Sequence, residues 1–560
     1  MKIAGAVCAL LLAAQIADAQ FERVGREQGR SMTITQRGIA ATSHILASQT
    51  ATGILARGGS AVDASIAANA VLGLVEPTMD GIGGDLFVLY WDAKAKEYIG
   101  LNGAGLSPKG LTPAHLASKG VKTMPTVGID SVTVPGAVDG WAKMHARYGK
   151  LPWKDLFSDA IHYAEQGFPV TEVIREVWAL PTSVSKLKPH SESTRVYLPG
   201  GRAPAVGELF RNPDLGHAYR LIAVGGRDAF YKGEIADAIL ATSKKLGGTM
   251  TAADLAATSA EWVRPISTDY RGWRVLELPP STQGIAALEM LNIMALQPAS
   301  LLGPRSPAEV HKRIESMKLA YADLRKYDAD PHSYDVPVNQ LLSPEWARQR
   351  AALIEPNTAN CGVAAGKIKQ GDTTYLTVVD RDGNMASWIE SVAHAFGSGI
   401  TVEGMGFLLH NRGWGFTLDP SDPDVLAGGK RPFHTIIPAF MEKGTQRIGF
   451  GIMGGANQPL AHAQFVSNIV DYGMDIQAAL EAPRFTKAEA AGCDLSIESR
   501  MGAETLERLS QMGHQLAIRR AYTQEMGRGQ AILHDSATGI NFGATDPRTD
   551  GAALPEPIFK

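Results

Sequence analysis

The chain has 560 residues, of which 45% are hydrophobic and 20% are charged, and its formal net charge is −3 at pH 7. Charges of both signs are spread along it without a basic stripe, so the sequence does not support a nucleic-acid partner or a membrane-surface partner. This composition is typical of a large globular enzyme or binding protein of the α/β type.

The first 19 residues have the pattern of a secretory signal. Lys2 precedes an apolar run over residues 3–16, and the small-residue cleavage pattern Ala17-Asp18-Ala19 follows it. We therefore expect residues 1–19 to be a signal peptide and the mature chain, periplasmic or secreted, to begin at Gln20. The run is shorter than the roughly 20 residues that a membrane-spanning helix needs, and we expect no membrane anchor.

Only Cys361 and Cys493 remain once Cys8 has left with the signal. Two cysteines form neither a disulfide scaffold nor a cysteine zinc site. One bridge between them is an open alternative, but unpaired cysteines are the expectation. The motifs HExxH, CxxC, GxSxG and GxxxxGK[ST] are absent from the sequence, and we expect neither a metal nor an organic cofactor.

Apolar residues at helical spacing predict two helices within residues 40–75. Gly58-Gly59 ends the first, because glycine readily adopts the left-handed conformation that closes a helix. Ser60 can then accept a hydrogen bond from the first turn of the second helix.

The period changes after the glycine-rich turn that follows these helices, and this predicts paired strands over residues 86–91 and 97–101. A helical region is predicted over residues 135–317. Its stretch 285–296 is apolar on almost every side, which predicts a buried helix. Residues 355–371 have no clear period and predict a mobile linker.

A strand is predicted to begin at Thr373, in "TTYLTVVD". The turn at Asp382-Gly383 and the following "MASWIES" predict a hairpin. The rest of the chain is predicted to add three strands and two helices, over residues 406–409, 435–441 and 447–452, and over residues 458–470 and 476–480.

Gly449, Gly451 and Gly454 match the GxGxxG pattern of dinucleotide-binding proteins, after a predicted strand and before a predicted helix. A dinucleotide unit needs a second parallel strand after that helix. Here one predicted helix leads into another, so the pattern does not indicate an oxidoreductase.

Thr373 has the sequence context of a nucleophile that acts at the start of a chain. A threonine hydroxyl needs a neighbouring base, and a threonine freed by chain cleavage can use its own α-amine, which titrates near 7.7–8.0. The sequence feature expected for this arrangement is a threonine at the start of a strand that follows a linker. Thr373 fits it, although threonine-rich strands are also ordinary.

Several stretches occur in the order found in one known family: "GGSAVDASIAANAVLGLVEP", "GIGGDLF", "VPGAVDGW", "LPPSTQG", "GDTTYLTVVDRDGN", "GKRPFHTIIPAF" and "MGGANQP". Over nearly its whole mature length the chain resembles the γ-glutamyltransferase (glutathione hydrolase) family of N-terminal nucleophile hydrolases. The resemblance implies the four-layer αββα sandwich of that superfamily, an α+β arrangement within the broad α/β class.

The resemblance also implies a proenzyme that cuts itself between Asp372 and Thr373. Residues 20–372 would form the large subunit and residues 373–560 the small catalytic subunit of a heterodimer. Thr373 would attack the amide carbonyl of a small-molecule substrate, form an acyl-enzyme and pass the acyl group to water or an amine. Gly454 and Gly455 match the family's oxyanion-hole amides, and Ser391 stands where the family has a threonine that bonds to the nucleophile.

The match fails at the residues that hold a γ-glutamyl group. The family's carboxylate-binding arginine is missing from the stretch 104–108, and its Ser-Ser pair is replaced by His434-Thr435. Residues that meet the α-amino group become Ala393, Arg412 and Gly415. An ammonium beside Arg412 would be repelled, which weakens glutathione as a substrate.

Arg412 could instead bind a carboxylate at the far end of a glutaryl, oxalyl or cephalosporin side-chain acyl group, with Trp414 against an apolar part. Arg412 could equally form an ion pair within the protein. His434 could donate to the same carboxylate or be a structural histidine. The interpretation is therefore a self-processing N-terminal threonine amidohydrolase, for which the family implies γ-glutamyl hydrolysis or transfer. Two alternatives remain open: a different acylase and, from another class, an inactive periplasmic binding protein.

Overall fold

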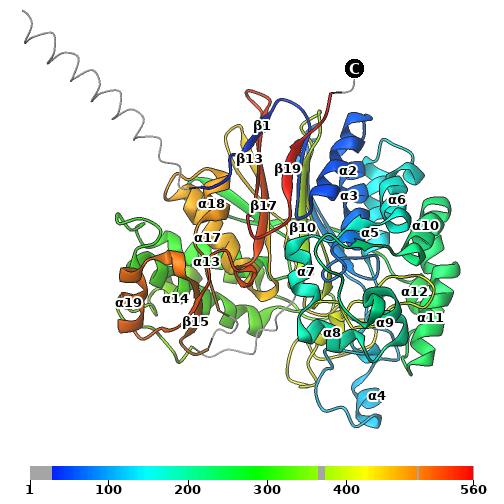
Figure 1. The fold of residues 1–560 in the computed structure, drawn as a ribbon. Coiled ribbons are helices and arrows are strands. Elements are labelled where there is room, and N and C mark those ends of the chain that lie inside the picture. Colours follow the sequence, from blue (N-terminus) through cyan, green and yellow to red (C-terminus); the bar gives the residue numbers. More distant parts are fainter. Residues whose placement is uncertain (1–27, 364–371, 488–490, 559–560) are drawn as a thin grey trace, which may run out of the picture.

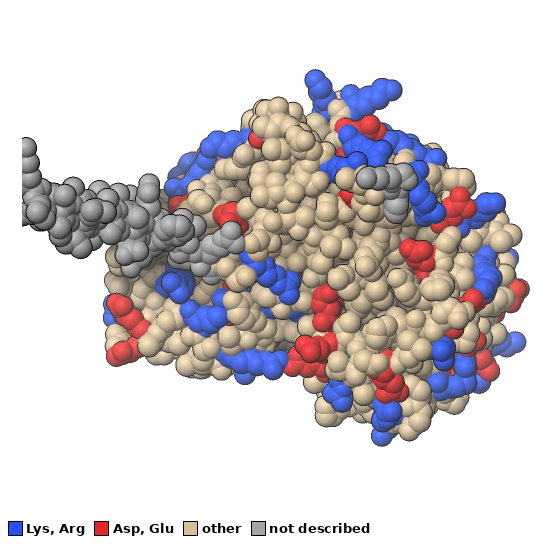
Figure 2. Space-filling view, turned by 45° about the horizontal axis from the view of Figure 1, so that its top comes forward, with Lys and Arg blue, Asp and Glu red and all other residues tan. Residues whose placement is uncertain are grey.

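The protein is described by a computed structural model that covers residues 28–363, 372–487 and 491–558 (Figure 1). The predicted signal and residues 364–371 of the predicted linker lie outside the described residues. No helix in the described part is long and apolar enough to cross a membrane. On the face shown in Figure 2, basic and acidic side chains are interspersed.

Two seven-stranded antiparallel sheets form the centre of the fold. The first has the order β1-β18-β17-β13-β12-β9-β8, with the bounds Thr33–Thr35, Ile540–Thr545, Arg528–Asp535, Gln446–Met453, Ala439–Lys443, Trp273–Glu277 and Ile266–Tyr270. The second has the order β19-β2-β10-β11-β3-β4-β7, with the bounds Ala552–Pro555, Ile39–Thr42, Asp372–Val379, Met385–Ala393, Asp85–Asp92, Glu97–Gly103 and Glu261–Val263.

Helices cover the outer face of each sheet, and an apolar layer joins the two inner faces (Figure 1). The helices on the second sheet include α2 (Ile45–Ala56), α3 (Ala61–Val75), α5 (Ala137–Tyr148), α6 (Ser158–Gln166) and α10 (Pro213–Tyr231). Those on the first sheet include α13 (Gly284–Ala295), α14 (Pro307–Tyr327), α17 (Gln458–Val470) and α18 (Ile476–Glu481). The predicted four-layer αββα sandwich is confirmed.

The boundary between α2 and α3 follows the predicted chemistry. Gly58 has φ +88°, a conformation that favours glycine. The Ser60 side chain accepts a hydrogen bond from the Asp63 backbone N–H, and the Asp63 side chain accepts one from the Ser60 N–H. This capping box starts α3, all of whose residues are buried beneath the second sheet.

The predicted hairpin is formed by β10 and β11, two central strands of the second sheet. Asp380 stabilises its turn, because one carboxylate oxygen accepts from the N–H groups of Asp382 and Asn384. The other oxygen accepts from the Ala61 N–H at the start of α3. The turn therefore fixes the hairpin against the helix layer.

Three predicted segments differ from the structure. Residues 406–409 form a loop, because Gly406 has φ +69° and approaches Asn212 and Asp214 too closely for a side chain. The strand predicted over 435–441 begins only at Ala439, because residues 435–437 bond to side chains instead. The helical region 135–317 is interrupted by strands, including β7, β8 and β9.

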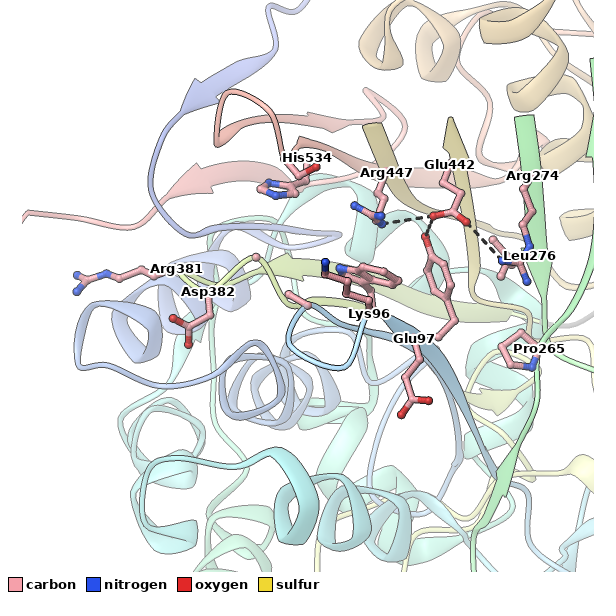
Figure 3. Close-up of a pocket in the computed structure, with 15 residues that line it drawn as sticks. Lys96, Glu97, Pro265, Arg274, Leu276, Arg381, Asp382, Glu442, Arg447 and His534 are labelled. Carbon is pink, nitrogen blue, oxygen red and sulfur yellow. Dashed lines mark hydrogen bonds and ion pairs between the residues drawn. The ribbon is translucent and has the colours of Figure 1, made fainter. Parts of the chain in front are cut away.

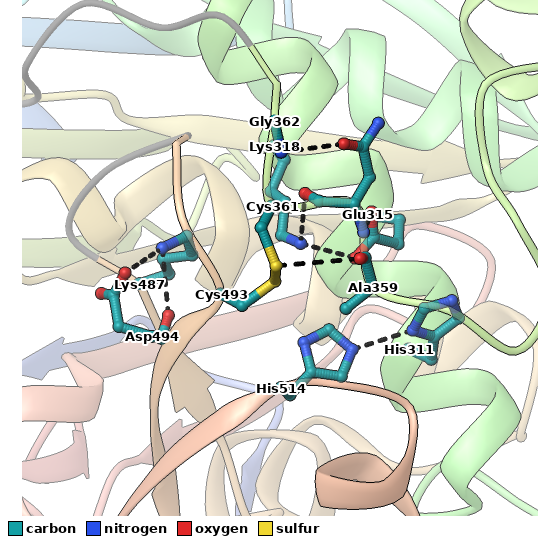
Figure 4. Close-up of a disulfide and its surroundings, with 11 residues drawn as sticks. His311, Glu315, Lys318, Ala359, Cys361, Gly362, Lys487, Cys493, Asp494 and His514 are labelled. Carbon is teal, nitrogen blue, oxygen red and sulfur yellow. Dashed lines mark hydrogen bonds and ion pairs between the residues drawn. A yellow bond between two sulfur atoms is a disulfide. The ribbon is translucent and has the colours of Figure 1, made fainter.

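The expectation of unpaired cysteines was wrong, because Cys361 and Cys493 form a disulfide (Figure 4). A backbone hydrogen bond from Gly492 N to Cys361 O at 3.1 Å joins their segments, and Gln515 N fixes Cys493 by donating to its carbonyl at 2.7 Å. The described start of the predicted mobile linker is also anchored, since Ala359 N donates to Met512 O at 2.7 Å.

Two glycines of β13 allow the sheets to approach each other. A Cβ on Gly449 would lie 2.8 Å from Thr377 Oγ1, and a Cβ on Gly451 would overlap the Tyr375 ring. Both contacts are with β10, so the glycines of the GxGxxG pattern serve sheet packing here.

Gly451→Ala is expected to lower the free energy of unfolding by about 1–3 kcal/mol, because the new methyl group overpacks the space beside Tyr375. Gly53→Ala is the control: it lies inside α2 with no atom near the added Cβ, and it should raise stability by up to about 1 kcal/mol. Thermal unfolding of both variants checks this, and an unchanged Gly451→Ala protein would contradict the packing argument.

Candidate active site

Thr373 lies at the buried head of β10 with its hydroxyl between two polar side chains. Its Oγ1 donates to Ser391 Oγ at 3.5 Å and accepts from Gln458 Nε2 at 3.4 Å. The hairpin register shifts between Asp372 and Thr374. In this uncut chain the Thr373 nitrogen is part of a peptide bond, so it becomes a base only after cleavage.

Ser391 is fully buried on β11, opposite the start of β10, so it is not a solvent-facing strand serine. Its Oγ also accepts from the Ala393 N–H at 2.8 Å. The position therefore suits the role that the resemblance assigns to it, a hydrogen-bond partner of the nucleophile.

Gly454 and Gly455 form the turn between β13 and α17. Their φ angles are +144° and +60°, which favour glycine at both positions. Gly454 also lines a cleft of 660 Å³, together with Asn457, Thr126 and His394. A substrate in this cleft would lie beside backbone N–H groups that side chains do not shield, as an oxyanion hole requires.

Two glutamines that the sequence analysis did not single out connect these parts, and both are fully buried. Besides donating to Thr373, Gln458 accepts from the Ile437 N–H at 3.1 Å. Gln283 donates through Nε2 to Thr435 O and to Gly455 O, the latter at 2.7 Å. The backbone of residues 435–437 is thus tied to both Thr373 and the Gly454-Gly455 turn.

The signal for both glutamines was their place inside "LPPSTQG" and "MGGANQP", two of the stretches that carry the resemblance. Within the described part of the chain, their side-chain amides bond to residues outside their own helices. Their contacts join positions far apart in the chain, so local spacing could not assign them a role.

Arg412 is fully buried and only partly satisfied. Its Nη1 donates to Thr435 Oγ1 at 3.0 Å, whereas Nε and Nη2 have no hydrogen-bond partner among the described residues. Burial lowers the pKa of Arg412 to about 10, so the guanidinium stays charged at neutral pH. Each buried donor without a partner costs about 1–3 kcal/mol, and an anionic ligand would remove that cost. The predicted internal ion pair is not formed at these two nitrogens.

His434 has both ring nitrogens occupied, which favours the structural alternative over substrate binding. Nδ1 lies 2.8 Å from Pro432 O, and Nε2 lies 2.8 Å from Asp85 Oδ2. Burial lowers the pKa of His434 and lowers that of His410 to about 4. The His410 ring is therefore neutral at neutral pH.

Asp85 organises this region from the start of β3. Its Oδ1 accepts from the N–H groups of Gly105 and Gly136, at 3.1 Å and 3.0 Å. Burial alone would raise the pKa of Asp85, but His410, His434 and Arg412 hold it below its ordinary value. The carboxylate is thus ionised and offsets part of the Arg412 charge.

At three positions where the sequence departs from the family pattern, the backbone restricts larger side chains that could bind a γ-glutamyl group. A Cβ on Gly105 would collide with Val134 O, and one on Gly415 would lie 2.6 Å from Phe433 O. Ala393 has φ +78°. Trp414 is buried with its ring 4.9 Å from the His394 ring, next to a wall of the cleft.

A wider cleft of 890 Å³ lies elsewhere (Figure 3). Glu442 accepts there from Tyr98 and forms ion pairs with Arg274 and Arg447. The cleft includes Asp382 in the hairpin turn, at the opposite end of β10 from the nucleophile. Although this cleft is larger, its position away from Thr373 argues against a catalytic role.

One group of potential metal ligands occurs among the described residues, His311, Glu315 and His514. The two histidines are hydrogen-bonded to each other at 2.8 Å, and Glu315 binds the Lys318 ammonium at 2.6 Å. These partners satisfy the group without an ion, and it lies beside the disulfide (Figure 4).

Comparison with known proteins adds three relatives. The sequence profile of the gamma-glutamyltranspeptidase family matches residues 47–556. A glutathione hydrolase-like YwrD proenzyme of Bacillus subtilis is 35% identical over 93% of this chain and 99% of its own. An oxamate amidohydrolase proenzyme of Klebsiella pneumoniae is 33% identical over 93% and 99%. The solved cephalosporin acylase of Bacillus halodurans is 40% identical over 95% and 98%, with a TM-score of 0.89.

Gln458→Met is expected to slow the self-cleavage by roughly 10-fold to 100-fold, equal to about 1.4–2.7 kcal/mol of barrier, because the nucleophile loses a donor. Gln464→Met, on the same helix, removes a buried amide that bonds only to Leu460 and Phe485. It should leave the cleavage rate of folded protein unchanged. Equal slowing in both variants, timed by mass spectrometry, would assign Gln458 a merely structural role.

Proposed function

Because the chain belongs to the gamma-glutamyltranspeptidase family, we propose that it cuts itself between Asp372 and Thr373 and that Thr373 then cleaves the monoamide of a dicarboxylic acid that carries no ammonium group. The protein is an amide hydrolase and acyltransferase of the N-terminal nucleophile type. The large and small subunits of one precursor would form the active heterodimer.

The freed α-amine of Thr373 would take the proton from Oγ1 while Oγ1 bonds to the substrate carbonyl carbon. Negative charge forms on the carbonyl oxygen, where N–H groups of Gly454 and Gly455 would stabilise it. The C–N bond then breaks, the amine leaves with the proton, and an ester to Thr373 remains. Water or an acceptor amine repeats the attack and releases Thr373.

The observation that carries the donor class is the pair of unpartnered buried nitrogens on Arg412. A carboxylate at the far end of the acyl group would accept from both in a fork-like geometry. A γ-glutamyl group would bring its ammonium close to the same cation, and the family's arginine clamp is absent. Glutaryl, oxalyl and cephalosporin side-chain acyl groups can offer Arg412 such a carboxylate. The names of two relatives, oxamate amidohydrolase and cephalosporin acylase, support this donor class.

Export to the periplasm or medium is part of the proposal. The signal pattern over residues 1–19 supports it, as does the disulfide, since disulfides persist mainly in oxidising compartments. The mature large subunit would then begin at Gln20.

Intact masses and N-terminal sequencing of the purified protein test the processing. Two chains are expected under reducing conditions, one starting at Gln20 and the other at Thr373. Thr373→Ala removes the nucleophile and should remain a single chain. A wild-type chain that stays uncut for days would contradict the enzyme assignment and favour the binding-protein alternative.

Arg412→Gln is expected to lower kcat/KM for a glutaryl or oxalyl amide by roughly 10-fold to 100-fold, because a charge-assisted bond of about 1.5–3 kcal/mol is lost. The matched control is a butyryl amide, whose turnover should not change, since it has no terminal carboxylate. Faster turnover of a γ-glutamyl amide than of every dicarboxylic monoamide would overturn the donor class and restore glutathione as the substrate.

A further inference from the structure

We infer that, in the processed protein, the disulfide between Cys361 and Cys493 is a covalent link between the large and the small subunit. The inference rests on the proposed cleavage between Asp372 and Thr373. Cys361 precedes that bond and Cys493 follows it, so cleavage leaves the two sulfur atoms on different chains. No third cysteine remains in the mature sequence to compete for either partner.

The large-subunit side of the bond is held on two sides. Lys318 of α14 donates to Asn360 O at 3.0 Å, and Asn360 N donates to Glu315 Oε2 at 3.2 Å. Ala359 N donates across the cleavage boundary to Met512 O. The segment before the cleavage site therefore lies between a helix of its own subunit and a part of the other (Figure 4).

The small-subunit side is equally fixed. Cys493 is 3% exposed and adjoins β15 (Asp494–Glu498), and its carbonyl accepts from Gln515 N. Lys487 binds Asp494 through the carboxylate at 2.6 Å. Because hydrogen bonds within and between the two subunits position both sides, cutting the Asp372–Thr373 peptide bond does not remove what holds the two sulfur atoms together.

Formation of the link balances as an ordinary thiol oxidation. The thiols of Cys361 and Cys493 lose two protons and two electrons as the S–S bond forms, and the disulfide of an exchange partner in the compartment to which the chain is exported accepts them and becomes a dithiol. Cys361 is exposed, so a reducing thiol can attack its sulfur and reopen the bond.

The link changes the thermodynamics of the heterodimer. Each sheet contains strands of both subunits, so separate chains would have to find each other after unfolding. A covalent link makes this reassembly intramolecular, at an effective concentration that a short connection can raise to about millimolar. Refolding of the processed protein should therefore be independent of protein concentration.

Denaturing electrophoresis of the alkylated, processed protein tests the inference. Without reductant we expect one species that contains both chains, and with reductant two separate chains. Two chains without reductant would overturn the link while leaving the processing intact. One chain even with reductant would overturn the proposed cleavage, as Thr373→Ala is expected to show under both conditions.

Cys361→Ser and Cys493→Ser supply the second measurement. Each variant should give two chains without reductant, and its recovery from denaturant should fall as the protein is diluted. If the refolded fraction of the variants does not depend on protein concentration, as in the wild type, the disulfide does not stabilise the heterodimer and this part of the inference is overturned. If either variant does not fold, wild-type protein refolded with and without reductant gives the same comparison.

Discussion

Burial of the β10–β11 hairpin on both faces is the constraint on which the rest of the structure depends. One face packs against the α3 layer and the other against the first sheet. Every side chain from Thr373 to Asp380 is buried. A nucleophile on such a strand has little freedom left to lose when a substrate aligns with it. Ser391 and Gln458 then only need to set the direction of its hydroxyl.

The proposed donor class depends on one buried cation, Arg412. Arg412 keeps its charge, and two of its donors have no partner among the described residues, while Asp85 offsets the charge from the side occupied by His434. His434 contacts Asp85, and the neutral ring of His410 adds no cation beside Arg412. A carboxylate gains from this arrangement and an ammonium loses, so selectivity comes from attraction and repulsion together.

Local patterns predicted what local chemistry controls. Ser60 capped its helix and Asp382-Gly383 turned the hairpin, because each acts through neighbours in the chain. The family resemblance supplied the sandwich and the proposed roles of Gly454 and Ser391, which spacing alone could not. Two predictions were wrong, the strand at 406–409 and the unpaired state of Cys361. The close approach of Gly406 to remote residues prevents the strand, and hydrogen bonds from remote segments hold Cys361 beside Cys493. Gln283 and Gln458 were missed for the same reason.

The GxGxxG pattern shows how sheet packing can imitate a nucleotide-binding motif. Side chains alternate along a strand, so positions 449 and 451 face the same way, and both face β10. Close packing on Tyr375 and Thr377 requires glycine at each. The third glycine, Gly454, answers a separate demand, the φ angle of the turn into α17. Close packing against β10 at Gly449 and Gly451, together with the φ angle at Gly454, thus accounts for the spacing of the three glycines.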